Sequence, residues 1–182
     1  MVGGKIILVD KKDNKLGAGE KLKVHREGKL HRAFSIFIFN SQGEILLQKR
    51  AKTKYHSAGL WSNACCSHPK VNKNIKDEAE KRLKEEMGIK CSLKEIFSFV
   101  YRANLGNLIE HEFDHVFVGE FNGNPKPNKK EAEDWKWINP KELKKDFKKN
   151  PENYTYWFKI ILNDVLSALK DGVSPKEDLV HP

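Results

Sequence analysis

The chain has 182 residues, of which 32% are charged, and its formal net charge is +9. A chain of this length buries roughly 70% of its unfolded surface, so we expect one domain with one core. No apolar run approaches the roughly 20 residues of a membrane span, the N-terminus lacks signal-peptide features, and no nucleic-acid-binding motif accompanies the basic residues. We therefore expect a cytoplasmic protein without a membrane or nucleic-acid partner, whose positive charge is either ordinary solvated surface or a grip for an anion.

The first 32 residues predict one strand followed by a basic loop. Residues 5–10 (KIILVD) favour the strand, and Asp13 and Asn14 end it with turn chemistry. Residues 21–32 carry His25 and His31 among lysines and arginines. Two histidines in such a stretch are commonly incidental, so they gain meaning only if other metal ligands join them.

Two further strands lead to the most unusual motif of the chain. Residues 33–39 are apolar on both faces, as in a central strand covered from both sides. Residues 40–43 (NSQG) turn the chain, and residues 44–50 return as its hairpin partner. Arg50, Lys52 and Lys54 follow, either as ordinary surface charge or as a grip for an anion.

The motif is WSNACCSHP at residues 61–69. In an extended segment, residues two apart point the same way, so Cys66 and His68 face one space. A thiol beside a cationic or metal-bearing neighbour can become the reactive thiolate. The chain has three cysteines, two of them adjacent, which is a poor disulfide framework and indicates reduced thiols.

A helix is predicted over residues 73–87. Every fourth residue from Ile75 to Met87 is apolar, which gives a buried stripe, and Gly88 ends the helix. A neighbouring row of charged residues at the same spacing indicates either surface ion pairs or a binding role. This row consists of Glu78, Arg82 and Glu86.

Two strands follow, over residues 96–102 and 108–119. On the second strand, Glu110 and Glu112 point to one face, with Cα atoms roughly 6.7 Å apart. Adjacent carboxylates repel each other and raise a pKa unless a cation lies between them. They are therefore either a surface pair or part of a metal site. His111 and His115 are a rival ligand set that strand geometry disfavours.

The remaining chain predicts an edge strand and two helices. Residues 131–138 favour the strand, and Asn139 and Pro140 begin a helix. Apolar residues at helical spacing from Trp157 onward predict a terminal helix with Trp157 in the core. The tail after Gly172 is expected to be loose.

Five segments carry a family resemblance, and they are LHRAFS at 30–35, WSNACCSHP at 61–69, EEMG at 85–88, YRA at 101–103 and EHE at 110–112. Together and in this order they resemble the metal-dependent, type 1 isopentenyl-diphosphate isomerases, a branch of the Nudix fold. The SNxxCxHP pattern is specific, whereas EExG is shared by Nudix proteins in general. The resemblance extends from about residue 21 to residue 157.

The resemblance implies a Nudix-type α/β/α sandwich with a mixed central sheet flanked by helices. We expect a single domain of this type, residues 1–182. Residues 1–32 would supply the N-terminal strand and a segment that binds metal and phosphate, and residues 173–182 would form a loose tail.

The resemblance also implies three sets of site residues. The metal ligands are His25, His31, His68, Glu110 and Glu112, a set that suits one Zn²⁺ or Mn²⁺, and Glu86, which would hold Mg²⁺ with the substrate diphosphate. The residues that bind the diphosphate are Lys21, Arg50, Lys54 and Arg82. The catalytic residues are Cys66, Glu112, Tyr101 and Trp157.

The implied reaction interconverts isopentenyl diphosphate and dimethylallyl diphosphate through a carbocation-like state, in isoprenoid biosynthesis. Cys66 and Glu112 would form the acid–base pair, with Tyr101 assisting Glu112 and the ring of Trp157 covering the cation. The neighbouring thiol of Cys65 is an alternative to Cys66, which stands two residues before a metal ligand. Such an enzyme would act as a monomer or homodimer.

The chain departs from the general Nudix box in a way that bears on the reaction. The box positions for a glycine, a glutamate and an arginine–glutamate pair hold Ser67, Lys73, Lys81 and Arg82 here. Because a Nudix hydrolase uses several glutamates to cluster Mg²⁺, the loss of two argues against hydrolysis. A hydrolase is one alternative function, and a non-catalytic basic binding module is another.

Overall fold

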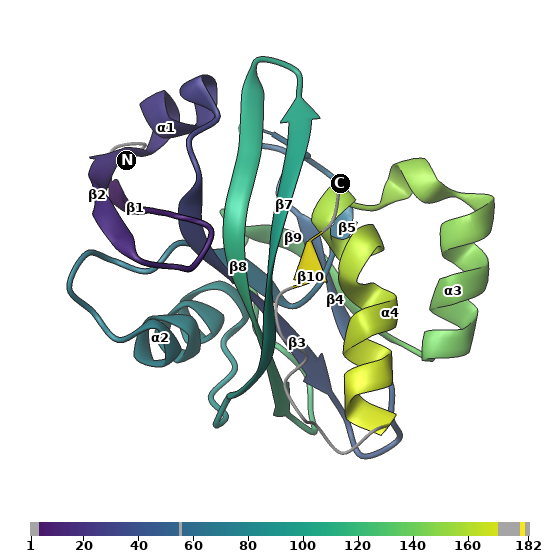
Figure 1. The fold of residues 1–182 in the computed structure, drawn as a ribbon. Helices are drawn as coiled ribbons and strands as arrows, with labels where there is room; N and C mark the ends of the chain where they lie inside the picture. The colour runs from purple at the N-terminus through teal and green to yellow at the C-terminus, as the bar shows by residue number, and fades with distance from the viewer. Residues whose placement is uncertain (1–3, 55, 171–178, 181–182) are drawn as a thin grey trace.

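The computed structural model describes residues 4–54, 56–170 and 179–180. These residues form a mixed sheet with helices on both faces, so the predicted α/β/α sandwich is confirmed (Figure 1). The strands are β1 (Lys5–Val9), β2 (Lys15–Glu20), β3 (His31–Phe39), β4 (Ile45–Arg50), β5 (Trp61–Ser62), β6 (Cys65–Ser67), β7 (Lys94–Leu105), β8 (Leu108–Glu120), β9 (Ala132–Ile138) and β10 (Leu179–Val180). The helices are α1 (Lys21–Glu27), α2 (Ile75–Met87), α3 (Pro140–Lys149), the 3-10 helix η1 (Pro151–Asn153) and α4 (Tyr156–Lys170). None of the described helices combines the length and the apolarity that crossing a membrane requires.

The sheet is centred on β3, which runs parallel to β8 along its whole length. The pairing starts with His31 beside Glu112 and ends with Phe39 beside Glu120. β7 pairs antiparallel with β8 and sets Tyr101 beside Glu112. Because paired residues on neighbouring strands share a face, three polar side chains from β3, β8 and β7 form one row.

The predicted hairpin between β3 and β4 forms only at its tip. The two strands pair at Phe39 and Ile45, and β4 then pairs with β5 and with β9. The reason is that β6 occupies the edge of β3 from Phe34 to Ile36. β4 must therefore diverge from β3, and its partner β9 completes that side of the sheet.

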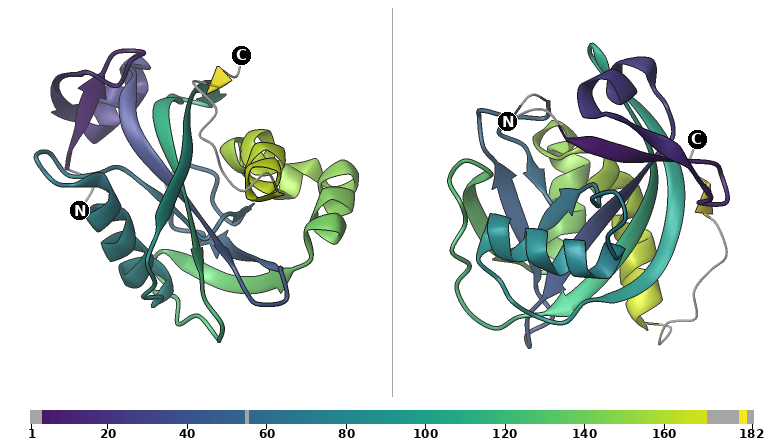
Figure 2. Two further views of the ribbon diagram at one scale, coloured as in Figure 1. Left: turned by 60° about the horizontal axis from the view of Figure 1, so that its bottom comes forward. Right: turned by 90° about the vertical axis from the view of Figure 1, so that its left-hand side faces the viewer.

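Alternate side chains of β3 enter two separate cores, which confirms the central strand predicted for residues 33–39. Phe34, Ile36 and Ile38 pack in the core beneath α2. Phe37 points the other way and contacts Phe158 of α4, with ring centroids 5.8 Å apart. Figure 2 shows α2 on one side of the sheet and α3 and α4 on the other.

Helix α1 corrects the interpretation of residues 21–32 as a loop. The Glu20 carboxylate accepts hydrogen bonds from the backbone N–H groups of Leu22 and Lys23 and so caps the first turn. Gly28 ends the helix in the left-handed conformation, with φ 62°. The two caps hold a helix of 7 residues, too short to show apolar periodicity.

The other predicted helices are present. α2 starts after its N-cap Asn74 and ends at Gly88, and α3 starts after Asn139, whose side chain caps Lys141 N–H. At the C-terminal end, β10 pairs in parallel with β7. The rest of the predicted loose tail, residues 173–178 and 181–182, lies outside the described residues.

Candidate active site

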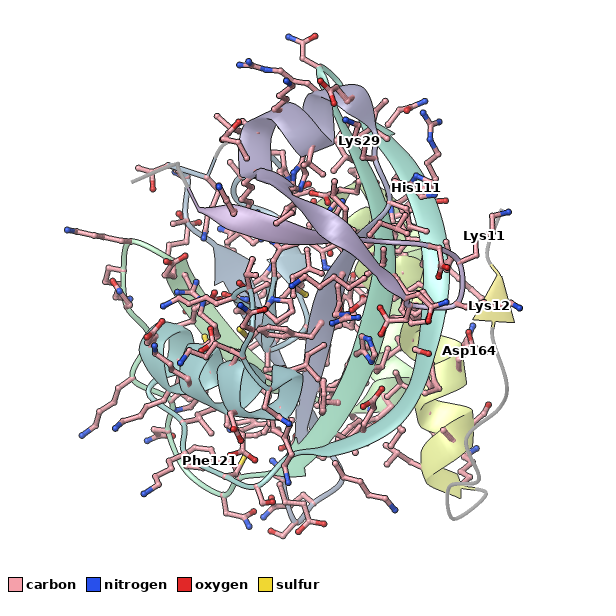
Figure 3. The ribbon with its side chains drawn as sticks, turned by 60° about the vertical axis from the view of Figure 1, so that its left-hand side comes forward. Lys11, Lys12, Lys29, His111, Phe121 and Asp164 are labelled. Carbon is pink, nitrogen blue, oxygen red and sulfur yellow. The ribbon has the colours of Figure 1, made fainter. Side chains whose placement is uncertain are left out.

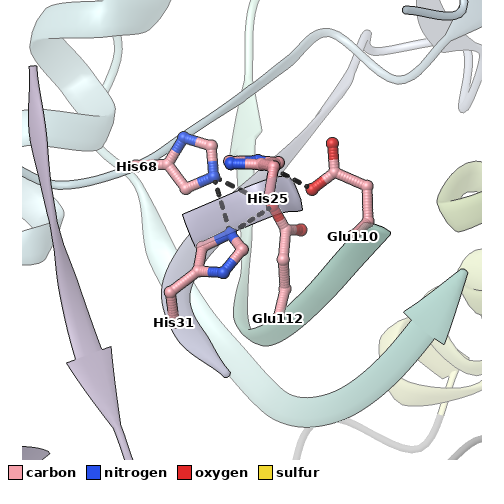
Figure 4. A group of neighbouring side chains, drawn as sticks. All are labelled: His25, His31, His68, Glu110 and Glu112. Carbon is pink, nitrogen blue, oxygen red and sulfur yellow. Dashed lines mark hydrogen bonds and ion pairs between the residues drawn. The ribbon is translucent and has the colours of Figure 1, made fainter. Parts of the chain in front are cut away.

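A cluster of histidines and glutamates, all buried except the half-buried His68, lies at one end of the β3–β8 pair (Figure 4). Each member offers one ligand atom, and these atoms all lie within 4.8 Å of one another. Helix α1, strand β3, the segment after β6 and strand β8 each contribute. The members are His25, His31, His68, Glu110 and Glu112, which is the ligand set that the sequence resemblance implies.

Backbone carbonyl groups fix the orientation of two of the imidazoles. His25 Nδ1 lies 2.7 Å from the Lys21 carbonyl oxygen, and His31 Nδ1 lies 2.8 Å from that of Lys29. A carbonyl oxygen only accepts hydrogen bonds, so Nδ1 carries the proton in both rings. The lone pair of each Nε2 is then directed into the cluster, as metal ligation requires.

The spacing inside the cluster suits a cation. His31 Nε2 and His68 Nε2 lie 3.2 Å apart, and Glu112 Oε1 lies 3.0 Å from the latter. Glu110 Oε2 is buried and lies 3.2 Å from His25 Nε2 but has no hydrogen-bond donor in suitable geometry among the described residues. Converging imidazole nitrogens and a buried carboxylate oxygen that lacks a donor fit a metal ion.

The protonation states also fit metal binding. Burial and the neighbouring charge of Lys21 lower the pKa of His68 to about 3, so this imidazole is neutral. Burial opposes ionisation of Glu110, but His25 and His56 outweigh it and hold its pKa well below the usual value. The neutral imidazole of His68 and the ionised carboxylate of Glu110 are forms that bind a metal ion.

The cluster forms one wall of a pocket of about 520 Å³, part of which is open to solvent. All eight residues that the resemblance assigns to catalysis and substrate binding meet there. Of the implied metal ligands, His25 and His31 are completely buried behind the wall. The pocket is lined by Lys21, Arg50, Lys54, His56, Cys66, Ser67, His68, Arg82, Glu86, Tyr101, Glu110, Glu112 and Trp157.

Cys66 presents a protonated thiol to this pocket. Its Sγ lies 3.1 Å from Asn63 Oδ1, which accepts the S–H, and 3.5 Å from Ser35 Oγ. Burial and the nearby Asp114 raise the pKa of Cys66 to about 12, so the residue is a thiol and not the thiolate that the motif suggests. Cys65 points into the core beneath α2 and does not line the pocket.

Glu112 connects the histidine–glutamate cluster to the pocket. The Tyr101 hydroxyl donates a hydrogen bond of 2.7 Å to Glu112 Oε2, while Oε1 faces His68. Burial and the adjacent Glu112 raise the pKa of Tyr101 well above its usual value, so the phenol keeps its proton. The carboxylate therefore has one oxygen toward the cluster and one toward a proton donor.

Trp157 is both a core residue and a wall of the pocket. Its ring is 4% exposed and packs in the core beneath α4. Its Nε1–H donates to Ser62 Oγ at 3.1 Å, and the Arg50 guanidinium lies 5.3 Å from the ring centroid. Trp157 can therefore be a core residue, as its helical spacing predicts, and also line the pocket, as the resemblance implies.

Basic side chains also line the pocket. Lys54 and Arg82 both contact the Glu131 carboxylate, and Arg82 also contacts Glu86 one helical turn away. Burial lowers the pKa of Lys21. The four residues predicted to bind the diphosphate, Lys21, Arg50, Lys54 and Arg82, all line this pocket.

Comparison with known proteins identifies the family. The family model described as NUDIX domain matches residues 29–158. An isopentenyl-diphosphate Delta-isomerase 2 of Aromatoleum aromaticum is 54% identical over 90% of this chain and 87% of its own length. One of Photorhabdus laumondii is 52% identical over 87% of this chain and 90% of its own length. The chain belongs to the isopentenyl-diphosphate Delta-isomerase family.

The resemblance of the five sequence segments to this isomerase family is thereby confirmed. Solved structures that are more distant in sequence share the fold. A protein of Deinococcus radiodurans gives a TM-score of 0.73 at 15% identity, covering 88% of this chain and 98% of its own. A MutT protein from Methanosarcina mazei Go1 gives 0.65 at 18% identity, covering 78% and 96%.

The isomerase-family site contains polar residues that sequence reasoning missed. Asn63 is part of the WSNACCSHP motif, so the sequence alone could have indicated it. Asp114 follows Glu110 and Glu112 at the same spacing of two residues along β8, and this spacing could have indicated that it faces the site. Its carboxylate accepts a hydrogen bond of 2.7 Å from Ser35. His56 and Glu131 lie in or next to loops, and the sequence contains no signal for either.

The rival pair His111 and His115 does not join the cluster. His111 Nδ1 lies 2.9 Å from the Gly28 carbonyl oxygen, and Figure 3 shows this residue near Lys29. His115 contacts Asp13 and Glu95 instead. Both side chains alternate with those of the glutamates along β8, as strand geometry predicts.

Proposed function

We propose that this protein is an isopentenyl-diphosphate Delta-isomerase, which interconverts isopentenyl diphosphate and dimethylallyl diphosphate in isoprenoid biosynthesis. One observation carries the proposal. In a chain 54% identical to a relative of that name, a single pocket is lined by the thiol of Cys66, by Glu112 with its phenol partner, and by basic side chains.

The reaction needs two proton-transferring groups because the substrate alkene carries no activating group. One proton must be added to one alkene carbon and another removed from a different carbon. Cys66 Sγ and the Glu112 carboxylate carry out these two transfers. Tyr101 donates to Glu112 Oε2 at 2.7 Å and assists Glu112 in its proton transfer, while the thiol of Cys66 and the ionised carboxylate of Glu112 start from opposite protonation states, so that one gives a proton and the other takes one.

The intermediate state resembles a tertiary carbocation and needs protection. The ring of Trp157 covers it, an attraction of about 2 kcal/mol when water is excluded. Water would trap the cation, so the exclusion of water favours isomerisation over hydration. The buried ring of Trp157 and the buried phenol of Tyr101 supply apolar surface there.

Metal ions and basic residues hold the substrate and the carboxylates. His25, His31, His68, Glu110 and Glu112 would hold one Zn²⁺ or Mn²⁺, which would allow two ionised carboxylates to lie side by side. Glu86 would bind Mg²⁺ together with the diphosphate. Lys21, Arg50, Lys54 and Arg82 bind the diphosphate itself.

We further propose that residues 1–182 act as one catalytic domain, as a monomer or homodimer, in the cytoplasm. Its partner is the small diphosphate substrate, with no nucleic acid. All three cysteines are free thiols, which suits a reducing compartment.

The proposal is tested by isomerisation assays on variants that retain their fold. Cys66→Ala and Glu112→Gln each remove a proton-transferring group, so we expect the rate to fall by about 10²–10⁴-fold with an unchanged circular dichroism spectrum. Cys91→Ala removes a thiol outside the pocket and serves as the control. Release of phosphate without isomerisation by the wild-type chain would show a Nudix hydrolase instead.

A further inference from the structure

His56 extends from the loop between β4 and β5 into the wall of the pocket. Its side chain is only 8% exposed, and its Nε2 lies 2.8 Å from Glu110 Oε1. The other oxygen of this carboxylate, Oε2, lies 3.2 Å from His25 Nε2, inside the metal cluster. The two oxygens of Glu110 therefore face different neighbours, one in the cluster and one outside it.

The tautomer of His56 can be inferred from its second nitrogen. Nδ1 lies 3.4 Å from the Ser57 hydroxyl, which can donate to it. Nε2 then carries the ring proton and donates it to Glu110. A carboxylate that accepts this bond at Oε1 cannot rotate without losing it.

Two contacts hold the imidazole in place. Arg50 donates hydrogen bonds of 3.2 Å from Nη2 to the His56 carbonyl oxygen and of 3.2 Å from Nε to that of Ser57. The ring meets Trp157 edge-on, with centroids 5.8 Å apart and an interplanar angle of 88°. The ring of His56 is thus fixed by its backbone on one side and by an aromatic wall on the other.

We propose that His56 is a positioning residue for the metal ligand Glu110, which it holds with Oε2 directed into the cluster. This inference rests on the metal site of the proposed function. Partners that hydrogen-bond to metal ligands fix ligand orientation, and their loss commonly lowers metal affinity 10–100-fold. His56 also links the proposed metal site to the aromatic side of the pocket, because its ring contacts both Glu110 and Trp157.

The test measures Zn²⁺ affinity of the full chain by competition with a chromogenic chelator, without substrate. His56→Leu removes the donor at similar volume, and we expect affinity to fall about 10–100-fold. His56→Gln keeps an N–H donor, and we expect a smaller loss. His115→Leu is the matched control, because His115 also contacts carboxylates but lies outside the cluster.

Thermal unfolding of the metal-free variants separates positioning from a general structural role. The inference predicts that His56→Leu loses Zn²⁺ affinity with little change in the metal-free unfolding temperature. Unchanged affinity in His56→Leu, or equal losses in His56→Leu and His115→Leu, would overturn it while leaving the isomerase activity of the wild-type chain untouched. A wild-type chain that isomerises its substrate but binds no Zn²⁺ would overturn the inference and not the reaction.

Discussion

At the scale of single residues, Asn63 determines how the reactive thiol is presented. Its amide group donates to the carbonyl oxygens of Ile36 and Cys65, both at 3.1 Å, and its Oδ1 accepts from Ser62 and Cys66. All four hydrogen-bonding positions of this buried side chain are therefore used. The thiol proton has a fixed direction, and the adjacent Ser62 accepts a hydrogen bond from the indole N–H of Trp157.

Glu131 is expected to weaken substrate binding, because it contacts two of the cations that would hold the diphosphate. Lys54 and Arg82 lower the pKa of Glu131, although burial opposes the shift, and the carboxylate is ionised. Glu131→Gln removes this competing charge. We expect the KM for isopentenyl diphosphate to fall about two- to fivefold, as for a partly exposed ion pair, with kcat unchanged in steady-state assays.

Glu133→Gln is the control for that measurement, because Glu133 pairs with Lys49 at 3.0 Å and does not line the pocket. A higher KM in Glu131→Gln would contradict the prediction and would indicate that Glu131 helps to bind the substrate.

The sequence reveals site residues where several lie in one motif, and it fails where a contact depends on a loop. Glu110 and Glu112 could be predicted because a strand alternates its side chains with a period of two. Cys66 and His68 could be predicted for the same reason, because they lie two residues apart in one motif. His56 could not be predicted, because its contact with Glu110 joins distant parts of the chain and depends on how the loop after Arg50 folds back.

At the scale of secondary-structure elements, α1 carries His25, one of the proposed metal ligands, in a segment that apolar patterning leaves unassigned. Its caps, Glu20 and Gly28, are visible in the sequence, but glutamate is not among the favoured N-cap residues. The helix places His25 four residues after Lys21, so that the ring donates to a carbonyl oxygen of its own helix. Short helices held by their caps and by tertiary contacts are difficult to predict from periodicity.

The end of α2 allows a direct test of close packing. A Cβ atom on Gly88 would lie 2.8 Å from the Lys126 carbonyl oxygen, whereas one on Gly43 would meet nothing within 4 Å. Both glycines have similar positive φ values, 69° and 72°. Gly43→Ala should cost about 1–2 kcal/mol through backbone strain alone, and Gly88→Ala about 1–3 kcal/mol more through overpacking.

Urea denaturation of the two alanine variants measures this difference. Equal losses in the free energy of unfolding would mean that the segment around Lys126 moves aside at no cost.

At the scale of the whole molecule, the layers could be predicted but the strand order could not. The doubly apolar pattern of residues 33–39 indicates a sheet covered on both faces, and both cores are present. The parallel pairing of β3 with β8 joins segments far apart in the chain, so local patterns carry no information about it. The single-domain boundary from 1 to 182 stays a prediction.

His115 makes global stability depend on pH. Burial opposes its protonation, but Asp13 and Glu95 raise its pKa to about 9, and these contacts tie the loop after β1 to β7 and β8. A raised pKa stabilises the fold fully below the unfolded value of about 6.5, and this contribution is lost as pH rises through about 9. We expect about 1–3 kcal/mol of unfolding free energy to depend on this residue.

The measurement is urea unfolding between pH 6 and 9.5. His115→Gln should be less stable than the wild type at pH 6 and nearly equal to it at the upper limit. Burial lowers the pKa of His111, so His111→Gln should not alter the slope above pH 6.5. A slope unchanged in His115→Gln would contradict the prediction.

The alignment of His31 with Glu112 across β3 and β8 has a consequence for how the protein matures. The side chains of these two proposed ligands become neighbours only after β3 and β8, which are far apart in the sequence, have paired in the correct register. A shift of the register by one residue would point one of the two side chains to the other face of the sheet. Binding of a metal ion at this site would therefore stabilise only those molecules in which β3 and β8 have paired in the correct register.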